Sequence, residues 1–207
     1  MNLINQINNL RNSEIKSIVE QRLKEFESFK NKQGEEWFSE MCFCLLTANS
    51  RADTAMRIQN QIGSKGFLHS PKENISYVIR QNKHRFHNNK AKYIVEARKF
   101  EHIKAILSKM PEFESREFLV ENVKGLGYKE ASHFLRNTGS KTLAILDRHI
   151  LNLMVENDYL EEKPKTLSKK IYLEIEEKFN SLAKDVNMTS SELDLYMWYL
   201  KTNKVLK

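Results

Sequence analysis

Turn-forming residues are scarce in this chain, and their scarcity limits the folds open to it. Only six glycines and three prolines occur among its 207 residues. Sandwiches and barrels reverse direction often and depend on such residues, so the shortage favours long helices. Apolar residues recur at helical spacing through most of the chain, and no segment is a confident strand. The sequence therefore predicts an all-α fold of about ten helices.

The length and the apolar content are sufficient for a folded core. A chain of 207 residues with 40% hydrophobic residues can form one domain, or two small lobes that share a cleft. We expect a single unit, 1–207, of two helical lobes around a cleft. The central lobe is expected at about 50–150, and the N-terminal and C-terminal helices, 1–49 and 151–207, are expected to form the other lobe. The charged connection Glu161–Lys165 is the expected hinge.

Local signals mark where the helices begin and end. Ser70 is the expected N-cap of one helix, Asp147 is the expected N-cap of another, and Gly63 and Pro111 are expected to end helices. The segment 35–48 is apolar on nearly all sides, which is typical of a buried central helix. The first expected helical region is 3–30, with an interruption near 12–13, and another helix opens at 70–73. The remaining expected helices are 35–48, 53–62, 88–109, 113–122, 129–137, 147–157, 167–186 and 190–202.

The composition excludes several classes of protein. A net charge of +7 suits a polyanion such as nucleic acid, although many ordinary proteins are equally basic. Because the chain has only two cysteines, Cys42 and Cys44, a four-cysteine zinc or iron–sulfur site is excluded and a disulfide framework is not expected. No segment has the apolar length of a signal peptide or a membrane span. We expect a soluble, intracellular protein of the cytoplasm or nucleoid.

The segment Lys124-Gly125-Leu126-Gly127-Tyr128 joins two expected helices through a tight turn. Two glycines around one apolar residue allow a sharp hairpin whose backbone N–H groups can approach an anion closely. The positive end of the following helix adds to this attraction. Such a turn can hold a DNA phosphate without reading sequence. The alternative is an ordinary turn between helices, because a Gly-x-Gly pattern alone is weak evidence.

Three blocks in order along the chain resemble the helix-hairpin-helix DNA glycosylase superfamily. The hairpin Gly-Leu-Gly-Tyr-Lys, followed by Leu-Asp-Arg-His-Ile at 146–150, is similar to the hairpin and aspartate segment of that family. Leu45-Leu46-Thr47-Ala48-Asn49 is similar to its Leu-Leu-Ser-Ala-Gln segment, and 86–91 to its apolar-Tyr-Asn-x-Lys-Ala segment. The resemblance implies that the two lobes enclose a DNA-binding cleft.

The size of the chain points to one branch of this superfamily. The branches with an iron–sulfur cluster carry four cysteines near the C-terminus, and this chain has none there. The larger eukaryotic 8-oxoguanine enzymes carry an additional N-terminal β-domain, for which this chain is too short. The chain most resembles the archaeal-type second family of 8-oxoguanine DNA glycosylases. This resemblance implies a bifunctional glycosylase and abasic-site lyase of base excision repair. It implies double-stranded DNA containing 8-oxoguanine as partner, and we expect a monomer.

The resemblance assigns the chemistry to two residues. Lys129 matches the nucleophile, whose neutral amine attacks C1′ of the damaged nucleotide and forms a Schiff base. Asp147 matches the carboxylate that stabilises positive charge on the sugar. The alternatives are that Lys129 only contacts a phosphate or solvent, and that Asp147 only caps a helix.

Three residues are expected near the extruded base. His133 lies four residues after Lys129 and so on the same side of the helix, where it could stack on the base. Trp198 is the candidate for a second stacking face. Lys207 matches the C-terminal lysine of the family, which serves near the base with its terminal carboxylate available. The alternatives are a structural histidine, a core tryptophan and a frayed terminus.

Four residues are expected at the DNA backbone and the base stack. Gly125 and Gly127 would approach the phosphate. Asn49 matches the residue that fills the space left by the flipped nucleotide, and Phe86 matches the wedge beside the estranged base. Asn49 could otherwise be a helix C-cap, and Phe86 a core residue.

No cofactor is expected, although members of this family often hold a sodium or potassium ion at the hairpin. The matching ligands are the backbone carbonyls of Glu121, Val123 and Leu126. Three rival interpretations remain open at this point: a non-catalytic helix-hairpin-helix binding module, a glycosylase for other oxidised bases, and a generic helical interaction protein.

Overall fold

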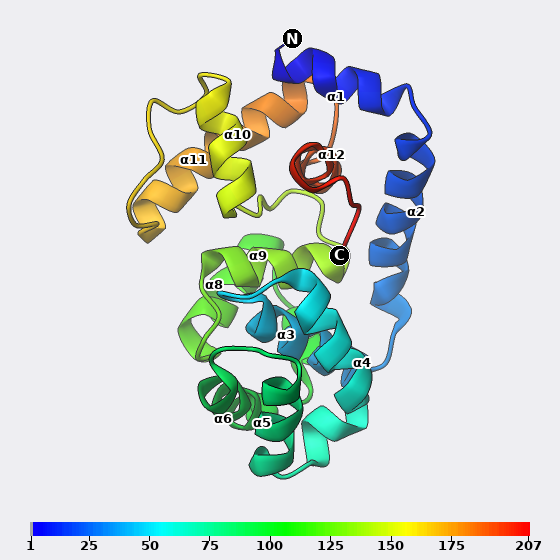
Figure 1. Cartoon of the computed structure of the whole chain (residues 1–207), viewed down its shortest axis with the longest axis vertical. Coiled ribbons are helices and arrows are strands. Elements are labelled where there is room, and N and C mark those ends of the chain that lie inside the picture. The colour runs from blue at the N-terminus through cyan, green and yellow to red at the C-terminus, as the bar shows by residue number, and fades with distance from the viewer. Residues whose placement is uncertain (1) are drawn as a thin grey trace. The chain divides into compact units, whose positions relative to one another are not determined.

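The described part of the chain, residues 2–207 of a computed structural model, is helical and contains no strand (Figure 1). The all-α prediction is therefore confirmed, with twelve α-helices and two short 3₁₀ turns in this range instead of about ten helices. The elements are α1 (Leu3–Arg11), α2 (Ile15–Ser28), η1 (Phe29–Asn31), α3 (Gly34–Thr47), α4 (Ala52–His69), α5 (Lys72–Gln81), α6 (His87–Ala97), η2 (Arg98–Phe100), α7 (Ile103–Leu107), α8 (Glu112–Asn122), α9 (Tyr128–Asn137), α10 (Arg148–Glu156), α11 (Lys169–Asp185) and α12 (Ser190–Thr202).

Contacts divide the chain into two compact units. Unit 1 comprises the described part of Met1–Ser28 together with Gly139–Lys207, and unit 2 is Phe29–Thr138. These bounds differ from the expected lobes, 50–150 and 1–49 with 151–207, because α3 packs on α4, α6, α7 and α9. The connection Glu161–Lys165 lies inside unit 1, so it does not join the two units as expected.

Unit 2 is built around α3. The apolar side chains of α3 are buried, as expected for a helix that is hydrophobic on nearly all sides; they include Trp37, Phe38, Met41 and Phe43. The helix starts with a capping box, in which the backbone N–H of Gln33 donates to Glu36 Oε2 at 2.9 Å. Because α4, α6, α7 and α9 all pack on the buried side chains of α3, these helices share one core.

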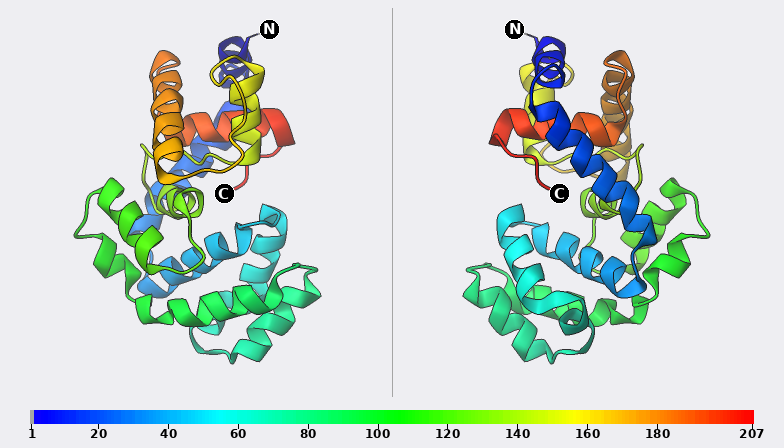
Figure 2. Two further views of the ribbon diagram at one scale, coloured as in Figure 1. Left: turned by 90° about the vertical axis from the view of Figure 1, so that its left-hand side faces the viewer. Right: turned by 90° about the vertical axis from the view of Figure 1, so that its right-hand side faces the viewer.

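Unit 1 is built around α12, which packs on α1, α2, α10 and α11. Within this unit α12 crosses α11 steeply (Figure 2). Leu193, Tyr196 and Met197 of α12 are buried. Side-chain caps fix the starts of four helices in this unit: Asn2 caps α1, Asp147 caps α10, Ser168 caps α11 and Thr189 caps α12.

Two helix boundaries differ from the prediction, and the one at Gly63 is confirmed. Gly63 has a φ of 68° and a ψ of 168°, so its non-helical backbone ends the first helical segment of α4 as predicted, and a second helical segment then runs to His69. Ser70 is the C-cap of α4, and Pro71 is the N-cap of α5. The expected helix 88–109 is divided at η2, where Arg98 Nε donates to the carbonyl of Phe67 at 2.9 Å and anchors the chain to the end of α4.

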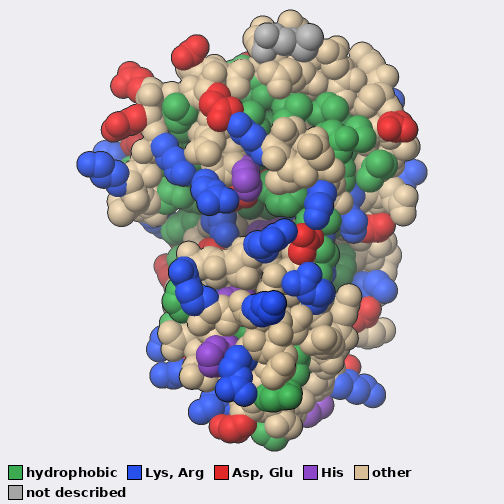
Figure 3. Space-filling model, in the orientation of Figure 1, with side chains coloured by type: hydrophobic (Ala, Val, Ile, Leu, Met, Phe, Trp, Pro, Cys, Tyr) green, Lys and Arg blue, Asp and Glu red, His purple; other side chains and the backbone are tan. Residues whose placement is uncertain are grey.

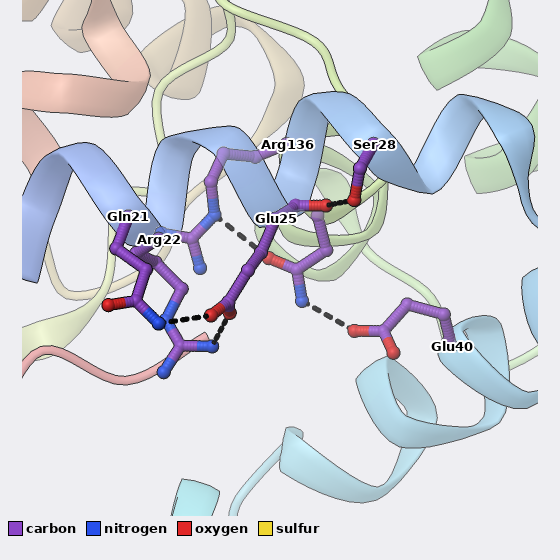
Figure 4. A network of polar contacts seen from close by, with 7 residues as sticks. Gln21, Arg22, Glu25, Ser28, Glu40 and Arg136 are labelled. Carbon is purple, nitrogen blue, oxygen red and sulfur yellow. Dashed lines mark hydrogen bonds and ion pairs between the residues drawn. The ribbon is translucent and has the colours of Figure 1, made fainter.

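Buried polar side chains tie α9 to α3 in unit 2 (Figure 4). Asn137 Nδ2 donates to Glu40 Oε1 at 2.6 Å, and Arg136 Nε donates to Asn137 Oδ1 at 2.9 Å. A separate network on α2 of unit 1 includes Arg22 Nη1, which donates to Glu25 Oε2. The buried network orients α9, since a partner lost from it would leave a buried polar group unsatisfied.

No helix within residues 2–207 has the length and hydropathy of a membrane span. No group of three or more His, Cys, Asp or Glu side chains in the same range is placed to hold a metal ion.

Candidate active site

The hairpin predicted from the two glycines lies between α8 and α9 of unit 2. Gly125 has a φ of 97°, and a Cβ there would lie 2.6 Å from Tyr93 Cδ2 and 3.1 Å from Leu45 Cδ2. Both the backbone conformation and the packing therefore require glycine at this position. Leu126 is buried, and its backbone N–H donates to the carbonyl of Val123 at 3.1 Å. The tip of the turn is thus pinned against the core while Gly125 and Gly127 stay exposed.

Lys129 is the second residue of α9, directly after this hairpin. Its side chain is 26% exposed, and Nζ lies 2.8 Å from Glu130 Oε1. The amine therefore lies at the positive end of α9, beside a backbone turn suited to a phosphate.

Lys90 of α6 is a second lysine near this site, and it is not among the residues that the sequence predicts for the site. It is only 5% exposed. Burial is the main cause that lowers the pKa of Lys90 to about 8; the charge of Glu130 opposes this shift and that of Lys129 adds to it. Lys90 is the lysine of the block 86–91, and its burial depends on packing between helices, which no local pattern in the sequence reports.

Asp147 is the N-cap of α10 in unit 1, as predicted. Its Oδ1 accepts the backbone N–H groups of His149 at 2.8 Å and Ile150 at 2.9 Å. Its Oδ2 accepts the indole N–H of Trp198 at 3.1 Å. The carboxylate is therefore held through both oxygens, and Trp198, which was proposed as a stacking face, also orients Asp147.

His149 lies against Trp198 and is not among the residues that the sequence predicts for the site. Its ring packs edge-on against Trp198, with centroids 6.1 Å apart and an interplanar angle of 83°. The signal was its place two residues after Asp147, in the first turn of α10. Lys207 lies five residues beyond the end of α12 and is half-buried in unit 1.

His133 lies one turn after Lys129 on α9 and is buried. Its ring packs edge-on against Phe43 of α3, with a centroid distance of 5.5 Å. This contact is the one expected of a structural histidine, and a role at the base remains a prediction.

Asn49 and Phe86 both lie on the surface of unit 2. Asn49 follows the C-cap of α3 with a left-handed φ of 60°. Phe86 is the N-cap residue of α6, is 37% exposed and lies under the guanidinium of Arg85 at 4.7 Å from the ring centroid. An exposed aromatic side chain at a helix start is available to insert into a base stack. Lys and Arg side chains are spread over the helices of unit 2 on the face that Figure 3 shows.

The predicted site residues thus fall into two sets. Unit 2 holds Asn49, Phe86, Gly125, Gly127, Lys129 and His133, and unit 1 holds Asp147, Trp198 and Lys207. The convergence of Lys129 and Asp147 on one nucleotide remains a prediction.

A helical chain in which a glycine hairpin leads into a lysine at the start of a helix, and in which a later helix is capped by aspartate, is a helix-hairpin-helix DNA glycosylase. The sequence model of the family described as 8-oxoguanine DNA glycosylase matches residues 19–188. The chain belongs to this family.

Named relatives match the chain over its whole length. The 8-oxoguanine DNA glycosylase/AP lyase of Methanocaldococcus jannaschii is 54% identical over 208 residues, with 100% of both chains covered. The enzyme of the same name from Thermotoga maritima is 45% identical, with 99% of both chains covered.

Solved structures give the same result. The M. jannaschii 8-oxoguanine glycosylase/lyase in complex with a 15mer DNA containing 8-oxoguanine matches with a TM-score of 0.97 at 54% identity, with 99% of both chains covered. The 8-oxoguanine DNA glycosylase of T. maritima matches with a TM-score of 0.94 at 44% identity and covers 99% of this chain and 98% of its own.

Proposed function

We propose that this chain excises 8-oxoguanine from double-stranded DNA and cleaves the resulting abasic strand, with Lys129 as the nucleophile. The observation that carries this function is the 54% identity, over the full length of both chains, to an enzyme named 8-oxoguanine DNA glycosylase/AP lyase. The activity belongs to base excision repair, and we place it in the cytoplasm or nucleoid, where the substrate is.

The chemistry starts with removal of the damaged nucleotide from the base stack, because C1′ is otherwise out of reach. The neutral amine of Lys129 attacks C1′, and the bond from C1′ to N9 breaks with its electron pair going to the base. The amine then loses one proton, which balances the proton that the base takes up. The amine then remains bound as a Schiff base to the opened sugar, and loss of a proton from C2′ expels the 3′ phosphate by β-elimination. The position of Lys129 beside the phosphate-binding turn supports this role.

Asp147 stabilises the positive charge that develops on the sugar. Its two backbone bonds and its bond from Trp198 support this role, because they hold the carboxylate in one orientation. The same three bonds also suit a purely structural cap.

Recognition of the base is assigned to His133, Trp198 and Lys207. 8-Oxoguanine differs from guanine by a donor at N7 and an oxygen at C8, so it must be read by an acceptor near N7 or a donor near O8. The ammonium group of Lys207 offers a donor for O8. Asn49 and Phe86 fill and support the gap in the stack, and Gly125 and Gly127 hold the phosphate.

No cofactor is required for this chemistry, and we propose that the chain acts as a monomer. A sodium or potassium ion would be held by the backbone carbonyl oxygens of Glu121, Val123 and Leu126, since oxygen ligands of this kind suit a hard cation. Such an ion would add positive charge at the hairpin.

The test is borohydride trapping of the wild-type protein on a duplex with one 8-oxoguanine. We expect a covalent complex with wild type and none with Lys129→Gln, which should lower excision by about 10³-fold or more and still bind the duplex. A matched undamaged duplex is the control. Trapping by Lys129→Gln would place the nucleophile elsewhere, and wild type that binds without trapping would favour the non-catalytic module.

Specificity is tested on a panel of duplexes, each with one defined lesion. Base release from 8-oxoguanine should exceed that from oxidised pyrimidines. The opposite order would favour the glycosylase for other oxidised bases.

A further inference from the structure

His84 is a buried titratable side chain that the proposed chemistry leaves without a role. It lies in unit 2, between α5 and α6, and is 3% exposed. Both ring nitrogens are used: Nε2 lies 2.9 Å from the carbonyl oxygen of Leu46, and Nδ1 accepts the backbone N–H of Phe86 at 3.2 Å. The imidazole therefore joins two segments that are 38 residues apart in sequence.

These two bonds define the state of the ring. A carbonyl oxygen can only accept, so Nε2 carries the proton and Nδ1 offers its lone pair to Phe86. Burial is the main cause that lowers the pKa of His84; the bond to Leu46 opposes this effect, and the charges of Lys90 and His87 add to it. The neutral ring is thus favoured, and it is the only form that can make both bonds.

Each end of this link leads to a residue assigned to the DNA. Leu46 is in the last turn of α3, where a carbonyl lacks a helical partner, and Asn49 follows three residues later. Phe86 itself receives the other bond through its backbone. Asn49 and Phe86 are exposed on the surface while His84 is buried beneath. A single rigid side chain therefore connects the backbone that carries the gap-filling residue to the backbone that carries the wedge.

We propose that His84 is a positioning residue that holds the segments of Asn49 and Phe86 in one fixed arrangement, so that both enter the duplex together as the damaged nucleotide leaves the stack. The inference rests on the proposed function, and in particular on the roles assigned to Asn49 and Phe86. The physical gain is preorganisation: the two segments need not be ordered again at each binding event.

Two isosteric substitutions divide the link. In His84→Asn the amide oxygen replaces Nδ1 and can accept from Phe86, whereas in His84→Gln the amide nitrogen replaces Nε2 and can donate to Leu46. Neither keeps both bonds. We expect each variant to lower single-turnover excision of 8-oxoguanine from duplex by roughly tenfold, while borohydride trapping at a preformed abasic site, which needs no base extrusion, changes less than about twofold.

A double-mutant cycle with Phe86→Ala separates positioning from general destabilisation. If His84 acts through Phe86, His84→Gln should reduce excision by less than about twofold in the Phe86→Ala background. Thermal unfolding of each variant confirms that it is folded at the assay temperature.

Three results would overturn the inference. Excision and abasic-site trapping could fall in equal proportion, the effects of His84→Gln and Phe86→Ala could multiply, or both His84 variants could excise at the wild-type rate. Wild type that neither excises nor traps would refute the proposed function and, with it, this role.

Discussion

At the scale of single residues, the bond from Trp198 to Asp147 leads to a prediction that separates two roles of the indole. Trp198→Phe keeps an aromatic face for the base but removes the N–H that holds Asp147 Oδ2. A lost hydrogen bond to a charged group corresponds to roughly 1.5–3 kcal/mol. We expect single-turnover excision to fall by about 10- to 100-fold, with little change in affinity for a duplex that contains an abasic analogue.

The control for this prediction is Trp198→Leu, which removes both the ring and the donor. If stacking is the only role of Trp198, the Phe variant should excise at the wild-type rate and the Leu variant alone should fail.

Lys90 is predicted to reduce the stability of the fold at neutral pH. Its pKa falls from 10.5 to about 8 on folding, so between these values the unfolded chain binds more protons than the folded one. The free energy of unfolding therefore rises with pH across this window, and at pH 7 the buried ammonium destabilises the fold by about 3 kcal/mol or less. Lys90→Met should stabilise the protein at pH 7 and have a smaller effect near pH 10.

Urea unfolding of wild type and Lys90→Met at both pH values measures this difference. The other lysines are common to both proteins, so the difference between the two curves isolates Lys90. Equal pH dependence of the two proteins would contradict the assignment. A buried lysine whose pKa is lowered further by the charge of Lys129 is typical of a functional site.

At the scale of elements, the hairpin between α8 and α9 tolerates change at only one of its two glycines. Gly125→Ala would place a Cβ 2.6 Å from Tyr93 Cδ2 at a φ of 97°, so clash and strain act together. Gly127 has a φ of −94°, and a Cβ there meets only Glu130 Oε2 at 3.3 Å. We expect Gly125→Ala to lower the free energy of unfolding by roughly 2–3 kcal/mol and Gly127→Ala by less than about 1 kcal/mol.

Chemical unfolding of the two alanine variants checks this order. Equal stability losses at the two positions would mean that the hairpin relaxes around Gly125. Binding of an undamaged duplex is measured on the same samples, since a displaced turn should also weaken the phosphate contact.

Elements whose ends depend on neighbouring residues could be predicted from the sequence. The helix after Asp147, the hairpin around Leu126 and the start of α12 all follow from local caps and spacing. The break at η2 could not, because it accompanies a bond from Arg98 to Phe67, 31 residues away. The second role of Trp198 depends on Asp147, 51 residues earlier, and the burial of Lys90 depends on packing between helices. Local patterns carry no information on such contacts.

At the scale of the whole molecule, the net charge of +7 predicts how binding of undamaged DNA responds to salt. Each phosphate that a lysine, an arginine or the hairpin neutralises releases counterions, so affinity falls with salt in proportion to the number of contacts. For roughly four neutralised phosphates, affinity should fall by about 100-fold between about 50 and 200 mM salt. Fluorescence anisotropy with Lys129→Gln measures this without turnover. Affinity that is unchanged across this range would show that the positive charge is not a footprint for DNA and that binding depends on uncharged contacts alone.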